Sequence, residues 1–182
     1  MNVALDFDGV VFDVAQAAMR FSRMRWDIDI EPHIVWPDAF RARLGEARYA
    51  ELFEAVHNSE FAMKTAPVVG ALSGIEALRR FTQLIVVTAR TPRQAAWATL
   101  WLRQHDLGDL EVVAAGDEKP AAVSRARADA YLDDMPRSLA GIQPPTHRFL
   151  LRTLYNGEGS GEWIVVAHWG AFVDHIQRLH ST

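Results

Sequence analysis

Short runs of apolar residues alternate with amphipathic stretches along most of the chain. The runs have the length and composition of buried strands and cover residues 2–7, 83–89, 110–115, 129–133, 147–154 and 163–167. The stretches between them repeat apolar positions at helical spacing, over residues 71–81, 92–105, 119–127 and 168–180, with a further short helix after Pro136. This alternation predicts an α/β fold, with a mostly parallel sheet and helices on both of its faces.

Residues 14–66 break this alternation. Apolar positions at helical spacing predict helices over 14–25 and 46–57, whereas the stretch 27–37 contains two prolines and predicts a loop. No part of this segment has the pattern of a strand. We therefore expect a small helical cap inserted after the first strand. The predicted division is a core of residues 1–13 and 67–182 and a cap of residues 14–66.

Composition narrows the class of protein. The chain has 182 residues, of which 49% are hydrophobic and 23% charged, as in ordinary globular domains. The formal net charge of −4 argues against nucleic-acid and membrane partners, which usually require a basic surface. The absence of cysteine excludes disulfides, thiolate metal ligands and a cysteine nucleophile. With neither a basic leader nor an apolar run of about 18 residues, we expect a cytoplasmic protein, and the sequence does not indicate its oligomeric state.

Polar and charged residues follow four of the predicted strands. The carboxyl ends of parallel strands meet at one edge of a sheet, and open α/β sheets bind their ligands beyond this edge. In chain order these residues are Asp6, Asp8 and Gly9, then Thr88 and Arg90, then Lys119, and finally Asp133 and Asp134. Lysine is a scarce residue type in this chain, since only two of the 19 basic residues are lysines.

These residue types suit phosphoryl chemistry. Convergent carboxylates need a cation, and hard oxygen ligands favour Mg²⁺. One aspartate can attack phosphorus to form an acyl phosphate, while a second aspartate two residues away can donate and accept protons. Thr88 and Lys119 can bind phosphate oxygens, and Gly9 lets the backbone approach them closely. Arg90 can bind the phosphate or the rest of the substrate. Taken singly, each of these residues also has an ordinary structural role in a turn or a helix cap.

Four segments together resemble the four motifs of the haloacid dehalogenase (HAD) superfamily: DFDGV at 6–10, Thr88 in VVTAR, Lys119, and YLDDMP at 131–136. The resemblance implies a Rossmann-like core. It also implies a phosphatase or phosphotransferase, because the dehalogenases of the superfamily lack the second aspartate of DFD. By this resemblance Asp6 is the nucleophile and a metal ligand. Asp8 is the general acid/base, and its backbone carbonyl is a further metal ligand.

The remaining motifs imply roles in binding. Thr88 and Lys119 resemble the residues that hold the phosphate. Asp134 resembles the last metal ligand, with Asp133 supporting it, and the cation implied is Mg²⁺. Many members have Thr at the position of Val10, a difference that removes no chemical group from the expected mechanism.

A further resemblance is to the 5′(3′)-deoxyribonucleotidase branch of the superfamily. It rests on the helical insertion, PVVGALSGIEAL, TAR, the paired aspartates, and FLLRTLYN followed by a tryptophan near the final helix. In that branch the cap closes over a nucleoside and aromatic side chains hold its base. The candidates for this role are Trp26, Trp36, Phe40 and Phe61. The stretch RTLYN lacks the proline of the Arg-Pro-Tyr-Asn-like stretch in that branch.

The sequence thus predicts a Mg²⁺-dependent phosphomonoester hydrolase that works through an aspartyl phosphate. Its expected substrate is a small phosphorylated metabolite, a (deoxy)nucleotide. Two alternatives stay open. A 3′-phosphatase acting on nucleic-acid ends would need a basic path to the site. A non-catalytic HAD-fold binding protein should have lost the motif residues.

Overall fold

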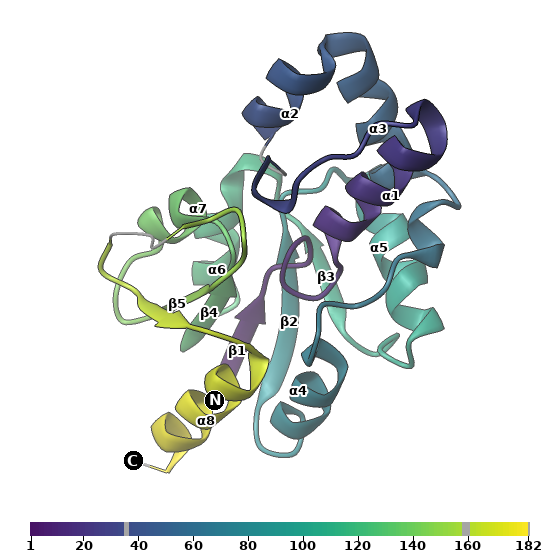
Figure 1. Cartoon of the computed structure of the whole chain (residues 1–182). Coiled ribbons are helices and arrows are strands. Elements are labelled where there is room, and N and C mark those ends of the chain that lie inside the picture. The colour runs from purple at the N-terminus through teal and green to yellow at the C-terminus, as the bar shows by residue number, and fades with distance from the viewer. Residues whose placement is uncertain (35–36, 158–160, 182) are drawn as a thin grey trace.

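The computed structural model describes residues 1–34, 37–157 and 161–181. Its centre is a six-stranded sheet in the order β3-β2-β1-β4-β5-β6, and all neighbouring strands are parallel (Figure 1). The strands are β1 (Asn2–Leu5), β2 (Gln83–Thr88), β3 (Glu111–Ala114), β4 (Ala130–Asp133), β5 (His147–Leu151) and β6 (Ile164–Val166). The predicted parallel α/β sheet is therefore confirmed.

Helices cover both faces of the sheet, and the alternation of side chains along β1 shows why. Val3 and Leu5 point into a core shared with α4, α5 and α8, whereas Ala4 points into a second core beneath α6 and α7. A strand buried on both faces has a continuous apolar sequence, as β1 does. These helices are α4 (Ala71–Leu78), α5 (Pro92–Gln104), α6 (Lys119–Arg125), α7 (Pro136–Ala140) and α8 (Trp169–His180).

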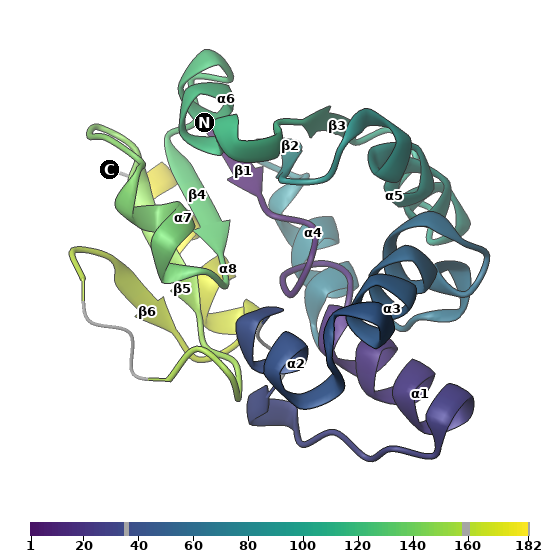
Figure 2. The ribbon, with the colours of Figure 1, turned by 90° about the horizontal axis from the view of Figure 1, so that it is seen from above.

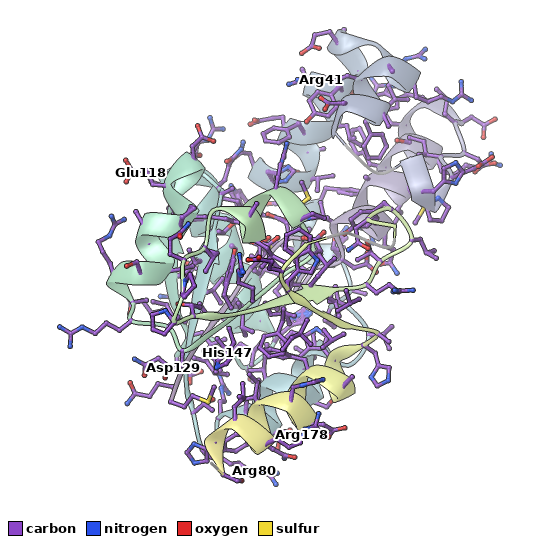
Figure 3. The ribbon with its side chains drawn as sticks, turned by 90° about the vertical axis from the view of Figure 1, so that its left-hand side faces the viewer. Arg41, Arg80, Glu118, Asp129, His147 and Arg178 are labelled. Carbon is purple, nitrogen blue, oxygen red and sulfur yellow. The ribbon has the colours of Figure 1, made fainter. Side chains whose placement is uncertain are left out.

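The segment between β1 and α4 is helical and lies beyond the carboxyl end of β1 (Figures 1 and 2). Figure 3 shows Arg41 of this cap and Arg178 of α8 at opposite ends of the molecule. The cap contains α1 (Val14–Trp26), α2 (Pro37–Leu44) and α3 (Glu46–Asn58), with short 3₁₀ turns at Pro32–Ile34 and Ala62–Lys64. Both ends of the cap therefore meet the core beside the loop that follows β1.

Helix α2 is the element that the sequence pattern does not predict. Its eight residues, PDAFRARL, cover only about two turns, which is too short for a clear helical stripe. Pro37 occupies its first turn, where a proline is tolerated because the missing N–H would have no partner there. The predicted helices over 14–25 and 46–57 correspond to α1 and α3.

Aromatic side chains fix the loop between β1 and the cap. The rings of Phe7 and Phe12 stack with their centroids 5.3 Å apart, and Trp101 of α5 packs edge-on against both. The indole N–H of Trp169 in α8 donates a hydrogen bond to the Val10 carbonyl at 2.8 Å. Helices from the core therefore hold this loop in place.

Strand β1 ends two residues earlier than predicted. The Asp6 amide still donates to the Leu132 carbonyl of β4 at 2.9 Å. The Phe7 amide, however, donates to the Asp6 side chain at 2.8 Å, so a local side-chain bond replaces the next sheet bond. Strand β5 similarly ends at Leu151, whose carbonyl accepts from the Asn156 side chain at 2.7 Å. Within the described ranges, no helix is both long enough and apolar enough to cross a membrane.

Candidate active site

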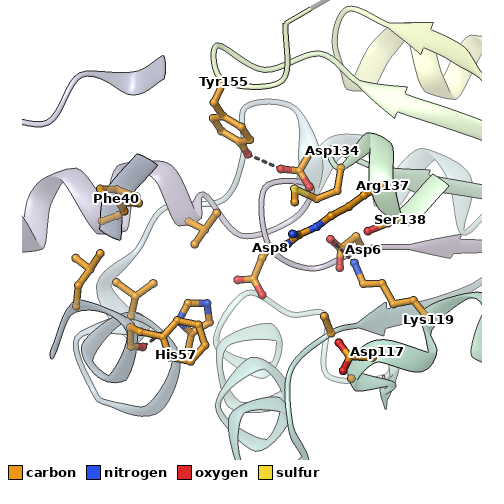
Figure 4. Close-up of a pocket in the computed structure, with 18 of the residues that line it drawn as sticks. Asp6, Asp8, Phe40, His57, Asp117, Lys119, Asp134, Arg137, Ser138 and Tyr155 are labelled. Carbon is orange, nitrogen blue, oxygen red and sulfur yellow. Dashed lines mark hydrogen bonds and ion pairs between the residues drawn. The ribbon is translucent and has the colours of Figure 1, made fainter. Parts of the chain in front are cut away.

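The carboxyl ends of the strands bring the predicted residues together around a cavity of about 540 Å³ (Figure 4). Four of them line this cavity: Asp6, Asp8, Lys119 and Asp134. Thr88 and Asp133 are fully buried beneath it. The Thr88 hydroxyl accepts a hydrogen bond from the Arg90 amide at 3.2 Å, so it orders the loop after β2. Its predicted contact with phosphate stays a prediction.

Lys119 joins two of the buried carboxylates. Its ammonium nitrogen lies 2.8 Å from Asp6 Oδ2 and 2.9 Å from Asp133 Oδ2. Asp133 also accepts hydrogen bonds from the Tyr131 hydroxyl and, at 2.7 Å, from the Met135 amide. Burial lowers the pKa of Lys119, but the two carboxylates outweigh it and raise that pKa above its usual range. Lys119 is therefore a fixed positive charge beside the predicted nucleophile.

Burial and nearby charges act on Asp6 in opposite directions. Burial raises the pKa of Asp6, Lys119 lowers it, and the neighbouring carboxylates raise it again, with a net pKa well above the usual value. A cation beside Asp6 would favour the ionised carboxylate that nucleophilic attack requires.

Arg90 forms an ion pair with Asp8. The sequence instead predicts that Arg90 contacts the phosphate or the rest of the substrate. Its guanidinium donates to both Asp8 oxygens, through Nε at 2.9 Å and Nη2 at 2.7 Å. The Arg90 side chain is 2% exposed, and it lies against the rings of Phe7 and Phe12. Arg90 also does not line the cavity. Burial raises the pKa of Asp8, but the charge and hydrogen bonds of Arg90 outweigh it and lower that pKa.

Asp134 is held by a phenol. Its Oδ2 accepts a hydrogen bond from the Tyr155 hydroxyl at 2.5 Å. Its Oδ1 is buried and has no hydrogen-bond partner in the described part of the chain. Burial, followed by the charge of Asp133, raises the pKa of Asp134 to about 7. A buried carboxylate oxygen without a partner is costly unless a ligand satisfies it.

The donor set fits a hard divalent cation. Carboxylate oxygens of Asp6, Asp133 and Asp134 lie within 4.8 Å of one another. Asp6 and Asp134 line the cavity, whereas Asp133 is buried beneath it with both oxygens bonded to Lys119, Tyr131 and Met135, so Asp6 and Asp134 are the carboxylates best placed to bind a cation. The orphaned Oδ1 of Asp134 supports this assignment. Oxygen donors of this type favour Mg²⁺, and the backbone carbonyl of Asp8 stays a predicted additional ligand.

Neighbouring side chains leave no space for a Cβ atom at Gly9. Its φ of +78° is in the left-handed region. A Cβ at this position would lie 2.2 Å from Asp134 Oδ2 and 2.5 Å from the Tyr155 hydroxyl. Close packing against Asp134 and Tyr155 thus explains this glycine, in addition to the predicted approach to phosphate.

Helix α3 supplies an aromatic wall opposite the carboxylates. Tyr49, Phe53 and His57 recur at every fourth position and line the cavity. The Phe53 and His57 rings stack with centroids 4.2 Å apart, and Figure 4 shows His57 across the cavity from Asp8. Burial lowers the pKa of His57, although the charge of Asp8 raises it. The lowered pKa favours a neutral imidazole. The spacing is visible in the sequence, but there it cannot be distinguished from an ordinary amphipathic face.

The aromatic residues predicted to hold a base lie in different places. Phe40 lines the cavity. Trp26 and Phe61 do not, because each packs edge-on against Phe21 inside the cap, with 5.3 Å between ring centroids. Trp36 lies outside the described residues.

Residues after β3, β4 and β5 complete the cavity on the core side. Asp117, Met135, Arg137, Ser138 and Tyr155 line it without having been predicted. Figure 4 shows the Arg137 side chain pointing into the cavity, on the same side as Asp134. Since several of these residues are ordinary exposed types in the sequence, only the fold reveals their position.

The sequence matches no model of a known protein family and no curated protein. Solved structures do match its fold. A haloacid dehalogenase-like hydrolase of Streptococcus pneumoniae has a TM-score of 0.70 and 8% identity, over 97% of this chain and 98% of its own.

Two further structures extend this similarity. A HAD family hydrolase of Deinococcus radiodurans R1, with bound phosphate and sodium, has a TM-score of 0.63 and 14% identity, over 97% of this chain and 95% of its own. An L-2-haloacid dehalogenase of Xanthobacter autotrophicus, with chloropropionic acid covalently bound, has a TM-score of 0.62 and 11% identity, over 97% of this chain and 98% of its own. The chain therefore has the Rossmann-like fold of the HAD hydrolases, as predicted. The likeness to the deoxyribonucleotidase branch stays a prediction.

Gly9→Ala should destabilise the protein far more than Gly45→Ala. Both glycines have nearly the same φ, +78° and +79°, but a Cβ at Gly45 would have no atom within 4 Å. Gly45→Ala therefore measures backbone strain without a clash, on the order of 1–3 kcal/mol, because ψ at Gly45 is 159°, a region that glycine alone adopts readily. Gly9→Ala adds the clash with Asp134, and we expect a larger fall in melting temperature. Equal falls for the two variants would show that the packing around Gly9 is not tight.

Asp134→Asn should stabilise the metal-free protein. The raised pKa of Asp134 means that folding stability falls as pH rises from about 4 to about 7, so the gain should be larger at pH 8 than at pH 5. At pH 8 in EDTA we expect the melting temperature to rise by about 2–4 °C, corresponding to roughly 1 kcal/mol. The stabilisation of the wild type by Mg²⁺ should disappear.

The control is Asp117→Asn, an exposed aspartate that lines the same cavity. Asp117→Asn should have nearly the same melting temperature as the wild type, both in EDTA and with Mg²⁺. A lower melting temperature for Asp134→Asn in EDTA would contradict the interpretation that Asp134 is an uncompensated charge.

Proposed function

We propose that this protein is a Mg²⁺-dependent phosphomonoester hydrolase that forms an aspartyl phosphate on Asp6. The observation that carries the proposal is the shared cavity of Asp6, Asp8 and Asp134, with Lys119 2.8 Å from Asp6. A nucleophilic carboxylate, a second carboxylate for proton transfer and a fixed cation are the groups that such a reaction uses. When bound at Asp6 and Asp134, Mg²⁺ would offset the negative charge of the phosphoryl group.

In the first half of the proposed reaction, an Asp6 oxygen attacks phosphorus and the bond to the leaving oxygen breaks. Because Arg90 holds Asp8 ionised, Asp8 must first take up a proton; it then gives this proton to the leaving oxygen, and the alcohol departs. In the second half, Asp8 removes a proton from water as the water attacks phosphorus. The acyl phosphate bond then breaks, which releases phosphate and restores the Asp6 carboxylate. Lys119 offsets negative charge in both halves.

The solved structures of similar fold include both a phosphate-bound hydrolase and a dehalogenase. Asp8 favours the phosphatase function for this chain. A halide leaves without accepting a proton, whereas the alkoxide of a phosphomonoester needs one. Asp8 lines the cavity two residues from Asp6 and, once protonated against the effect of Arg90, can supply that proton.

For the substrate, we propose a small phosphorylated metabolite with a planar ring, a (deoxy)nucleotide. The wall formed by Phe40, Phe53 and His57 presents flat apolar surfaces opposite the carboxylates. The cavity volume of about 540 Å³ lies within the usual range of about 300–1,000 Å³ for small-molecule sites. The aromatic side chain of Phe53 is 38% exposed. Such exposure of a large apolar side chain is expected where a ligand covers it.

Hydrolysis of p-nitrophenyl phosphate tests the reaction. The wild type should release nitrophenol with Mg²⁺ and not with EDTA, and Asp6→Asn should be inactive because an amide cannot form the acyl phosphate. Asp8→Asn should slow hydrolysis of an alkyl ester such as glycerol phosphate by about 10²–10⁴-fold. Substantial activity of Asp6→Asn would contradict the mechanism. Chloride release from 2-chloropropionate would favour the dehalogenase alternative.

Phe53→Ala tests the proposed leaving group. Stacking on an aromatic ring is worth about 1–3 kcal/mol per base, and about 1.4 kcal/mol is a factor of ten. We therefore expect KM for a deoxynucleoside monophosphate to rise about tenfold, with little change for acetyl phosphate, which has no ring. Met24→Ala, which removes a 72% exposed side chain from α1, should change neither value. Equal losses on both substrates would mean that Phe53 only stabilises the cap.

A further inference from the structure

The geometry points to Tyr155 as a positioning residue for the cation site. Its phenol holds one oxygen of Asp134 and leaves the other oxygen for the cation. This inference rests on the proposed function, because it concerns the cation which that function requires. It assigns a role to the loop after β5, which the four sequence motifs do not include.

The two oxygens of Asp134 have different surroundings. Oδ2 accepts the Tyr155 hydrogen bond at 2.5 Å, whereas Oδ1 is buried without a hydrogen-bond partner in the described chain. A carboxylate can rotate and exchange its oxygens unless a neighbour distinguishes them. Gly9 leaves room for this pair, since a methyl group there would overlap both Oδ2 and the phenol. The phenol therefore determines which oxygen is available to a ligand.

Hydrogen bonds connect the loop after β5, which carries Tyr155, to Asp134. The side-chain amide of the next residue, Asn156, donates to the Asp134 carbonyl at 2.9 Å and to the Leu151 carbonyl at 2.7 Å. Its oxygen accepts from the Thr153 amide at 3.0 Å. One side chain thus connects the end of β5 to the end of β4. The phenol approaches Asp134 from a loop that is anchored to the same aspartate.

A phenol suits this task better than a cationic side chain. Lys119 and Arg90 form ion pairs with the carboxylates beside them and offset their negative charge. Tyr155 orients Asp134 through a neutral donor, so the carboxylate keeps its charge for a cation. A phenol hydroxyl can donate a hydrogen bond without carrying a charge. Partners of this kind typically contribute 10–100-fold to metal affinity.

Tyr155→Phe removes the hydroxyl and retains the ring. Mg²⁺ binding to the full-length chain can be measured by isothermal titration calorimetry without substrate, together with the melting temperature in EDTA. We expect the Mg²⁺ dissociation constant to rise at least tenfold. Tyr49→Phe makes the same chemical change on α3 across the cavity and should leave the Mg²⁺ dissociation constant unchanged.

The outcomes separate the two proposals. If the wild type binds Mg²⁺ and Tyr155→Phe binds it equally well, the positioning role is wrong and the proposed function is unaffected. If only the melting temperature in EDTA falls, Tyr155 is merely structural and the inference is also wrong. If the wild type binds no Mg²⁺ and hydrolyses p-nitrophenyl phosphate without it, the Mg²⁺ requirement fails together with the inference.

Discussion

The crowding of four aspartates at one edge of a parallel sheet is the constraint on which the rest of this structure depends. Burial and mutual repulsion both oppose ionisation of such carboxylates. The chain responds with two buried cations, Lys119 beside Asp6 and Asp133, and Arg90 on Asp8. Asp134 is held instead by a neutral phenol. Cationic side chains thus pair with three of the carboxylates, whereas Asp134 keeps one oxygen without a partner in the described chain.

The fold creates this arrangement through the order of its strands. Strands β1 and β4 are neighbours although more than a hundred residues separate them in the chain, so Asp6 and Asp134 meet at adjacent strand ends. The cap leaves the core directly after this site. Phe7 and Phe12 connect the two parts, because the same rings pack on Trp101 and cover the Arg90 guanidinium. Core packing and the position of Asp8 are therefore linked.

The sheet and the strand-end residues could be predicted because their signals are local. Apolar runs identify the strands, and the parallel topology brings the residues after each strand to one edge. The partner of Arg90 could not be predicted, since the direction of a long side chain depends on Asp8, 82 positions away in the sequence. The cap aromatics were also ambiguous. Phe53 and Trp26 have similar helical surroundings in the sequence, and only the packing of α3 over the cavity distinguishes a lining residue from one that packs within the cap.

The distribution of polar partners around Asp134 is difficult to explain by stability alone. A sequence selected only for folding could replace this aspartate with a neutral residue, because its charge is buried, repelled by Asp133 and left with one oxygen unsatisfied. Instead, Gly9, Tyr155 and Asn156 all pack against it or bond to it. Strain and unsatisfied groups that the surroundings hold in place are characteristic of functional sites. The free energy given up at Asp134 is therefore the strongest structural argument that this cavity binds a cation.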